Sequence, residues 1–306
     1  MIGLFDSGDG GLSVFREVYK LLPDEKYVFY GDNANCPYGE KTEDFIQERA
    51  RIITEFLIKE GARIIVVACN TATAAAINTL RAEYSDAAKP EVRSKVLNLS
   101  NGRQDHIRFI GMEPAVKPAA IWTKTGTIGV LATAGTLKGS NYLTTKGKYE
   151  DDVRIVEHVG QGWVELVEKG ILDGPEAEAT VKASIGPLLE EGADTLVLGC
   201  THYPFLMDAI RKVAGPSIKI IDPAPSVARH LVYVMTQEGL LTGRASNQAL
   251  ARLISQSEAE AKGENPDNAI SVIRPKMKIF SSGDGISLKR IFDLLYPKPQ
   301  GYQRLP

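Results

Sequence analysis

Cysteine is scarce in this chain, and long apolar runs are absent. Three cysteines in 306 residues, an odd number, argue against a disulfide framework and for free thiols. No apolar run is long enough to span a bilayer, and the amino terminus reaches Asp6 and a glycine too early for a secretory apolar segment. We therefore expect a cytoplasmic protein with reduced cysteines and no membrane contact.

An excess of charge of either sign is also missing. The 36 lysines and arginines nearly balance 38 aspartates and glutamates, and the basic residues are scattered, so no nucleic-acid footprint is present. The hydrophobic fraction of 43% is that of an ordinary globular protein. A chain of 306 residues exceeds the usual size of a single core, so two lobes are expected.

Short β-type runs alternate with helical patterns along most of the chain. This alternation is typical of βαβ units and predicts an α/β fold with largely parallel sheets. Residues 85–108 show no clear periodicity and are predicted to form an inserted loop or a crossing between lobes. The expected strands are 2–5, 27–30, 64–68, 109–112, 127–131, 153–156, 195–198, 218–221 and 277–280, and the expected helices are 12–22, 42–59, 71–84 and 226–236.

Two of the three cysteines have matching surroundings. Cys69 follows the apolar residues 64–68, Cys200 follows residues 195–198 after one glycine, and small polar residues come next in both cases. Functional groups of open α/β sheets gather beyond the carboxyl ends of the strands. Two thiols presented in the same way suggest paired acid–base chemistry, one group from each half. The polar residues predicted at such strand ends are Asp6, Ser7, Asp32, Cys69, Asn70, Thr71, Thr133, Thr136, Cys200, Thr201 and His202.

A single cysteine after a strand is usually a small buried hydrophobic residue, but the paired context favours function. A helix amino terminus lowers the pKa of a nearby thiol from about 8.5, so such a thiol could act as a base near neutrality. His202 lies close enough to Cys200 to orient it. Cys36 has no counterpart and is interpreted as a loop cysteine. A zinc site of Cys69, Cys200 and His202 is conceivable, but no Cys/His pair repeats at finger spacing, so no metal is predicted.

The glycine-rich residues 8–11 do not indicate a nucleotide. They lack the lysine of a phosphate-binding P-loop and the spacing of a dinucleotide motif, and Asp6 and Asp9 would repel phosphate. A tight turn that exposes Asp6 and Ser7 is predicted instead, with no cofactor. Glu168, on an expected helix, is by default a solvated charge.

Taken together, five segments resemble the glutamate racemase family, in order and with family-like spacing from residue 2 to roughly residue 235. Thr-His-Tyr-Pro after Cys200 looks like the glutamate branch, since related aspartate racemases typically carry a glutamate where His202 stands. The segments are residues 6–13, residues 31–34 with 37–39, residues 68–74, residues 129–133 with 135 and 136, and residues 199–204.

The resemblance implies a cofactor-independent racemisation with two bases, in which one thiolate removes the α-proton and the other thiol protonates the opposite face. Cys69 acts on D-glutamate and Cys200 on L-glutamate, with Asp6 beside the first thiol and His202 assisting the second. The other residues that match family positions are Ser7, Tyr38, Gly39, Asn70, Thr71 and Thr201 for substrate binding, shared with Asp6 and His202, and Asp32, Glu168, Thr133 and Thr136 as supporting residues.

The resemblance further implies two similar lobes with the active site between them. Residues 1–110 with 222–306 are expected to form the lobe of Cys69, and residues 111–221 the lobe of Cys200. The expected role is to supply D-glutamate for peptidoglycan, with glutamate as the small-molecule partner and a homodimer as the assembly. The alternatives are an aspartate racemase, a thiol oxidoreductase that cycles a Cys69–Cys200 disulfide, and a non-catalytic protein that binds an acidic amino acid.

Overall fold

The structure, a computed structural model, describes residues 1–241, 244–262, 275 and 277–297. The strands form two sheets, with the orders β4-β3-β1-β2-β9 and β6-β5-β7-β8. Each pair of neighbours in these sheets is parallel, which confirms the α/β prediction. The strands are β1 (Ile2–Asp6), β2 (Tyr27–Gly31), β3 (Ile64–Val67), β4 (Arg108–Ile110), β5 (Thr127–Ala132), β6 (Arg154–Val159), β7 (Thr195–Gly199), β8 (Lys219–Ile221) and β9 (Met277–Ser281).

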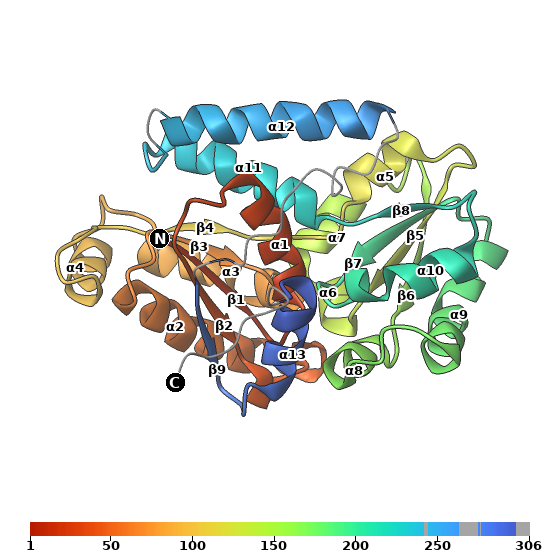
Figure 1. The fold of residues 1–306 in the computed structure, drawn as a ribbon, viewed down its shortest axis with the longest axis horizontal. Helices are drawn as coiled ribbons and strands as arrows, with labels where there is room; N and C mark the ends of the chain where they lie inside the picture. The colour runs from red at the N-terminus through yellow and green to blue at the C-terminus, as the bar shows by residue number, and fades with distance from the viewer. Residues whose placement is uncertain (242–243, 263–274, 276, 298–306) are drawn as a thin grey trace.

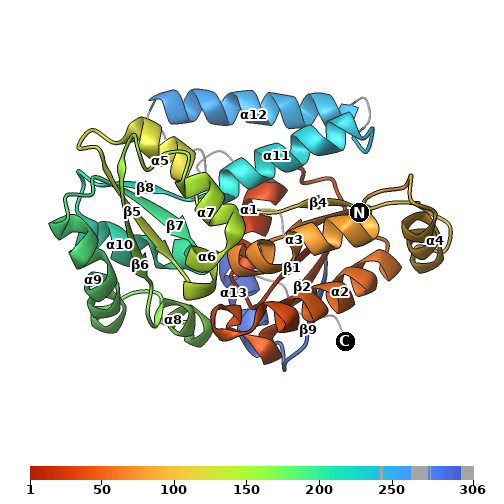
Figure 2. The ribbon, with the colours of Figure 1, turned by 180° about the vertical axis from the view of Figure 1, so that it is seen from behind.

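Helices cover both sheets, which lie side by side (Figure 1). Figure 2 shows α2 and α3 on the first sheet and α9 and α10 on the second, from behind. The helices are α1 (Gly11–Leu21), α2 (Glu43–Lys59), α3 (Asn70–Tyr84), α4 (Pro90–Leu99), α5 (Val116–Trp122), α6 (Ala134–Lys138), α7 (Ser140–Lys146), α8 (Trp163–Lys169), α9 (Pro175–Glu190), α10 (Met207–Ala214), α11 (Ala224–Gln237), α12 (Arg244–Lys262) and α13 (Ile286–Leu295).

Local chemistry explains where these helices begin and end. The hydroxyl of Thr42 accepts a hydrogen bond from the backbone N–H of Phe45, and Glu43 and Asp44 lie in the first turn of α2. Gly61 follows the end of α2 with φ +99°, a conformation that favours glycine.

Several described helices were not predicted, among them α4 and α12. The loop predicted over residues 85–108 is wrong, because α4 occupies Pro90–Leu99 within it. Pro90 fits the first turn of α4. Only Val92 and Val96, four residues apart, are buried, so the apolar face of this helix is too narrow to show a helical period in the sequence. Helix α12 was not predicted because its sequence is mostly polar. It lies along α11 (Figure 1).

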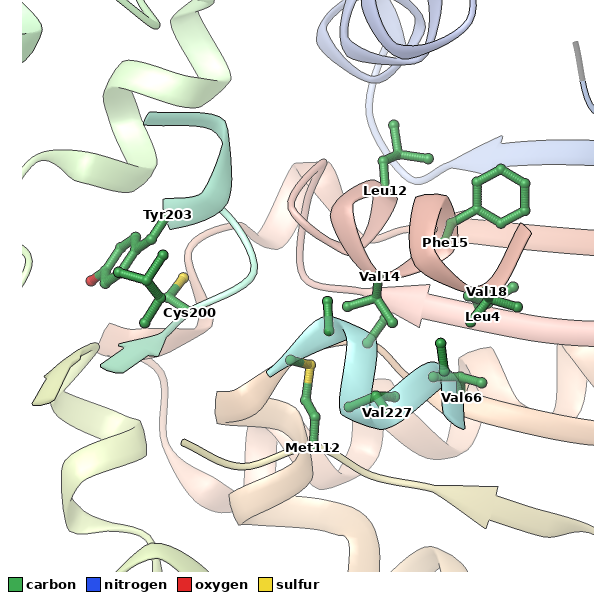
Figure 3. Packing of buried hydrophobic residues seen from close by; sticks show 14 of the residues in the cluster. Leu4, Leu12, Val14, Phe15, Val18, Val66, Met112, Cys200, Tyr203 and Val227 are labelled. Carbon is green, nitrogen blue, oxygen red and sulfur yellow. The ribbon is translucent and has the colours of Figure 1, made fainter. Parts of the chain in front are cut away.

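The hydrophobic core continues from one sheet to the other. One cluster joins Leu4 and Phe15 of the first sheet layer to Cys200 and Tyr203 beyond β7, with Met112 between them (Figure 3). The carboxyl ends of both sheets therefore face a common packed region. Among the described helices, none has both the length and the apolar content needed to cross a membrane.

Candidate active site

The loop that leaves β1 places Asp6 at the centre of the contact between the two halves. One Asp6 oxygen accepts the backbone N–H of Ser7 at 2.7 Å, and the other accepts the backbone N–H of Gly11 at 2.6 Å and the Thr201 hydroxyl at 3.3 Å. Burial raises the pKa of Asp6, and the positive charge of His202 opposes that shift. The predicted exposure of Asp6 is wrong: its side chain is fully buried and holds the loop.

Two glycines allow this loop to approach the second half closely. A Cβ atom at Gly10 would lie 2.4 Å from Nδ1 of His202, and one at Gly8 would lie 2.4 Å from Oε1 of Glu168. Any larger residue would therefore push the loop away. The Ser13 hydroxyl completes the contact by donating to the carbonyl of Thr201 at 2.9 Å.

Cys69 ends the β3 segment and caps helix α3. Its Sγ accepts the backbone N–H of Ala72 at 3.4 Å and lies 3.7 Å from the hydroxyl of Ser7. The expected helix terminus is thus present, but the expected lowering of the thiol pKa is wrong. Burial, together with the negative charge of Asp6, raises the pKa of Cys69 well above its usual value and outweighs the backbone N–H.

Cys200 is the first member of a chain of polar contacts. Its Sγ lies 3.8 Å from Nδ1 of His202, whose Nε2 lies 2.7 Å from Oε1 of Glu168. Burial alone would lower the pKa of His202, but its hydrogen bonds to Cys200, Cys36 and Glu168 raise it well above its usual value. Burial would raise the pKa of Glu168, but the hydrogen bond with His202 and its positive charge lower it to about 2. His202 and Glu168 therefore form an ion pair of an imidazolium and a carboxylate.

Cys69 and Cys200 line one small cavity. Its volume of about 10 Å³ leaves room for roughly one water molecule. Its lining comes from both sheets: Ser7, Pro37, Tyr38, Gly39, Cys69, Asn70, Thr71, Thr133, Val164, Cys200, Thr201 and His202. The predicted residues Asp6, Asp32, Glu168 and Thr136 are not in this lining and act from behind it.

Hydroxyl groups close the cavity across the two halves. Oγ1 of Thr71, on α3, lies 2.9 Å from that of Thr133 and 3.3 Å from that of Thr136, both next to β5. The side-chain amide of Asn70 is buried and has no hydrogen-bond partner among the described residues. Because a buried amide without partners is costly, these atoms are suited to bind a polar ligand in the cavity.

Asp32 lies behind the cavity wall. Its carboxylate accepts two hydrogen bonds from Arg49, at 2.8 and 2.9 Å, and one from the Tyr38 hydroxyl at 2.6 Å. Burial would raise the pKa of Asp32, but the hydrogen bonds from Arg49 and Tyr38 lower it. Asp32 thus holds the Tyr38 hydroxyl in place, and the turn that contains Tyr38 places Gly39 at the cavity.

Two groups at this site were not predicted from the sequence. Asp9, considered only as a charge that repels phosphate, is buried next to Glu168 and accepts a hydrogen bond from Asn33 at 2.7 Å. Cys36, interpreted as a loop cysteine, has its Sγ 3.8 Å from Oε1 of Glu168. The segments that hold these residues are far apart in sequence, so no spacing pattern could reveal the contacts.

Asp9→Asn is expected to stabilise the protein above neutral pH by about 1–3 kcal/mol. Burial and the charge of Glu168 raise the pKa of Asp9 from 3.8 to about 7. Between these two values the folded state keeps a proton that the unfolded state has lost, so the Asp9 contribution to stability falls as pH rises to about 7. An amide needs no ionisation and can still accept from Asn33.

Urea unfolding at about pH 5 and about pH 8 measures this effect, since the gain should be larger at the higher pH. Asp151→Asn, in an exposed turn, is the matched control. An equal gain at both pH values would contradict a raised pKa at Asp9.

Known proteins resemble this chain in both sequence and fold. Residues 104–231 match the family described as Asp/Glu/Hydantoin racemase. The chain is 41% identical over 286 residues to a glutamate racemase from Methylococcus capsulatus, covering 92% of this chain and 97% of that protein. A crystal structure of a glutamate racemase isoform from Bacillus anthracis superposes with a TM-score of 0.72 at 29% identity, over 99% of this chain and 94% of that one.

A structure of the Escherichia coli glutamate racemase, in complex with L-glutamate and the activator UDP-MurNAc-Ala, also superposes, with a TM-score of 0.61 at 32% identity. It covers 77% of this chain and 82% of that chain. The similarity thus extends over both sheets and the cavity between them.

Proposed function

This chain belongs to the glutamate racemase family, and we propose that it interconverts L-glutamate and D-glutamate by proton transfer at Cys69 and Cys200. The observation that carries the proposal is that one thiol from each half of the molecule lines the same closed cavity. Bases on both faces of the substrate invert the α-carbon without any need to turn the substrate over. The bound L-glutamate of the Escherichia coli relative supports the choice of substrate.

In the L-to-D direction, the Cys200 thiolate removes the α-proton and the Cys69 thiol donates its proton to the opposite face. The products are a Cys200 thiol, a Cys69 thiolate and D-glutamate, so one proton is lost and one gained at the carbon. The imidazolium of His202 lies 3.8 Å from Cys200 Sγ and would stabilise its thiolate. Cys69, beside the carboxylate of Asp6, is held as the thiol.

The α-proton of an amino acid is a very weak acid, so the carbanion that develops as it leaves must be stabilised. A dry cavity with fixed hydrogen-bond donors supplies much of this stabilisation. Ser7, Asn70, Thr71 and Thr201 offer hydroxyl and amide groups for the two carboxylates of glutamate. Since the cavity has room for about one water molecule, we infer that the two halves move apart to admit glutamate. The threonine hydroxyls would then re-form their contacts around the bound substrate.

The same proposal includes the lobes and the biological setting. Residues 1–110 with 222–306 would form one lobe and residues 111–221 the other, which agrees with the distribution of strands between the two sheets. We also infer a cytoplasmic enzyme that supplies D-glutamate for peptidoglycan and assembles as a homodimer. Light scattering on the purified protein tests the dimer.

A chirality-resolved assay tests the reaction. Purified protein given L-glutamate, D-glutamate or L-aspartate in separate reactions is expected to racemise both glutamate enantiomers and to leave aspartate unchanged. Activity should persist after exhaustive dialysis with a chelator and without pyridoxal phosphate, nucleotide or metal. Turnover of aspartate at a similar rate would favour the aspartate racemase alternative, and glutamate binding without α-proton exchange would favour a binding protein.

A further inference from the structure

Three side chains from separate segments meet behind Cys200. Cys36 lies in the turn between Asn33–Asn35 and Tyr38–Glu40, Glu168 lies near the end of α8, and His202 follows β7. Their ligand atoms all lie within 4.8 Å of one another. We propose that Cys36, Glu168 and His202 form a binding site for a thiophilic divalent cation of the zinc class, and that its occupation inhibits the enzyme. The inhibition, but not the binding, depends on the proposed racemase function.

The donor set has the chemistry of a zinc-type site. One thiolate, one imidazole and one carboxylate are ligands that Zn²⁺ and Co²⁺ take in proteins, with a fourth position left for water. The charges also balance. Without a cation the cluster holds a Cys36 thiol, a Glu168 carboxylate and a His202 imidazolium, whose charges cancel. A divalent cation would displace one proton from Cys36 and one from His202, so the buried cluster would stay neutral.

The distances need only a small adjustment. Sγ of Cys36 and Oε1 of Glu168 are 3.8 Å apart, close to the separation of roughly 3.5 Å that tetrahedral zinc bonds impose on their ligands. Nε2 of His202 and Oε1 of Glu168 are 2.7 Å apart and would open by less than about 1 Å as the cation replaces the shared proton. Gly8 borders this space, because a Cβ atom there would lie 2.4 Å from Oε1 and 2.8 Å from Sγ.

The surroundings favour a cation and allow its entry. Asp6, Asp9, Cys200 and Tyr203 are titratable groups among the described residues that also act on this cluster. Oδ2 of Asp9 is buried and has no hydrogen-bond partner among the described residues, so it adds an unsatisfied oxygen beside Glu168. Cys36 is half-buried and the side chain of Glu168 is 20% exposed, so a cation can arrive without crossing the reaction cavity.

Occupation would disable the Cys200 half of the reaction. A cation on Nε2 removes the proton that makes His202 an imidazolium, and it takes the carboxylate of Glu168 as a ligand. The imidazole, 3.8 Å from Cys200, would then be held as a metal ligand and could no longer respond to the proton transfer at that thiol. Because the cation lies behind the cavity wall, kcat should fall while KM for glutamate changes little.

Cobalt binding to the substrate-free protein tests the site directly. We expect one Co²⁺ per chain, a thiolate-to-cobalt charge-transfer band, and release of two protons per cation. Cys36→Ser should lose the band and lower the affinity for Zn²⁺, measured by equilibrium dialysis, by about 10²-fold. Zn²⁺ should inhibit the parent protein but not Cys36→Ser, when each is compared with its own rate in buffer with a chelator. Cys69→Ser should bind Co²⁺ like the parent protein.

Two results would overturn the proposal. If Cys69→Ser loses the band while Cys36→Ser keeps it, the cation binds the two cavity thiols instead. If Cys36→Ser and the parent protein bind Zn²⁺ with equal affinity, the cation is adventitious. Circular dichroism of each variant establishes that it is folded. The binding measurements need no turnover, so a protein that bound Co²⁺ as expected but failed to racemise glutamate would refute the proposed function alone.

Discussion

Cys69→Ser and Cys200→Ser are each expected to lower the rate of glutamate racemisation by at least about 10³-fold. Each substitution replaces a thiol with a hydroxyl, a far weaker acid, at one face of the α-carbon. Both directions should slow equally in kcat/KM, because enantiomers have equal free energies in water and the equilibrium constant is unity. The measurement is the change of optical rotation from each enantiomer.

Deuterium exchange separates the two faces. A variant that lacks one thiol can still remove and return a proton with the other, so the α-position would exchange without inversion. In deuterated water, Cys69→Ser should exchange L-glutamate and retain its configuration, whereas Cys200→Ser should do so with D-glutamate. This result follows from the assignment of Cys200 to the L-enantiomer and Cys69 to the D-enantiomer.

Cys36→Ser is the matched control, since Cys36 is a free thiol that does not line the cavity. It should racemise glutamate at close to the parent rate in buffer with a chelator. Near-parent racemisation by either Cys69→Ser or Cys200→Ser would rule out the mechanism with two thiols. Dependence of the parent protein on an added oxidant would instead favour the thiol oxidoreductase alternative.

The strand ends and the paired thiols were predictable from sequence because both depend on short-range pattern. Apolar runs of four or five residues are typical of buried parallel strands, and polar residues that follow such strands gather at the carboxyl edge of the sheet. Cys69 and Cys200 therefore stood out before any contact was known. The helix over Glu43–Lys59 was equally clear, since Thr42 and Gly61 mark its two ends.

What could not be predicted depends on contacts between distant residues. Nothing near Asp9 in the sequence indicates Glu168, 159 residues away. The pKa of Cys69 was expected from its helix terminus alone, a local feature, whereas burial and Asp6 decide it in the fold. Helix α4 was not predicted because its local pattern is weak. Two buried valines, Val92 and Val96, are enough to pack it against the protein but too few to form a recognisable helical period.

The two halves of the site are chemically unlike, although their sequences look alike. Cys69 has the negative charge of Asp6 beside it, and Cys200 has the positive charge of His202. The site therefore places a negatively charged neighbour beside Cys69 and a positively charged neighbour beside Cys200. The charge of His202 would therefore support proton removal at Cys200, the step proposed for L-glutamate.

His202→Asn is accordingly expected to lower kcat/KM by roughly 10²-fold in both directions, because the thiolate of Cys200 loses its counter-charge. Glu168→Gln should cost about 10-fold, since a neutral amide keeps a hydrogen bond to His202 but not the ion pair. Steady-state kinetics from each enantiomer across pH measures both effects.

Glu165→Gln is the control for this series, because Glu165 lies one turn earlier on α8 and is exposed. It should keep the parent rate and pH profile. If Glu165→Gln lost as much activity as Glu168→Gln, the loss would come from disturbing helix α8 and not from removing the ion pair with His202. A kcat/KM at the parent level in His202→Asn would mean that the charge of His202 does not assist proton transfer at Cys200.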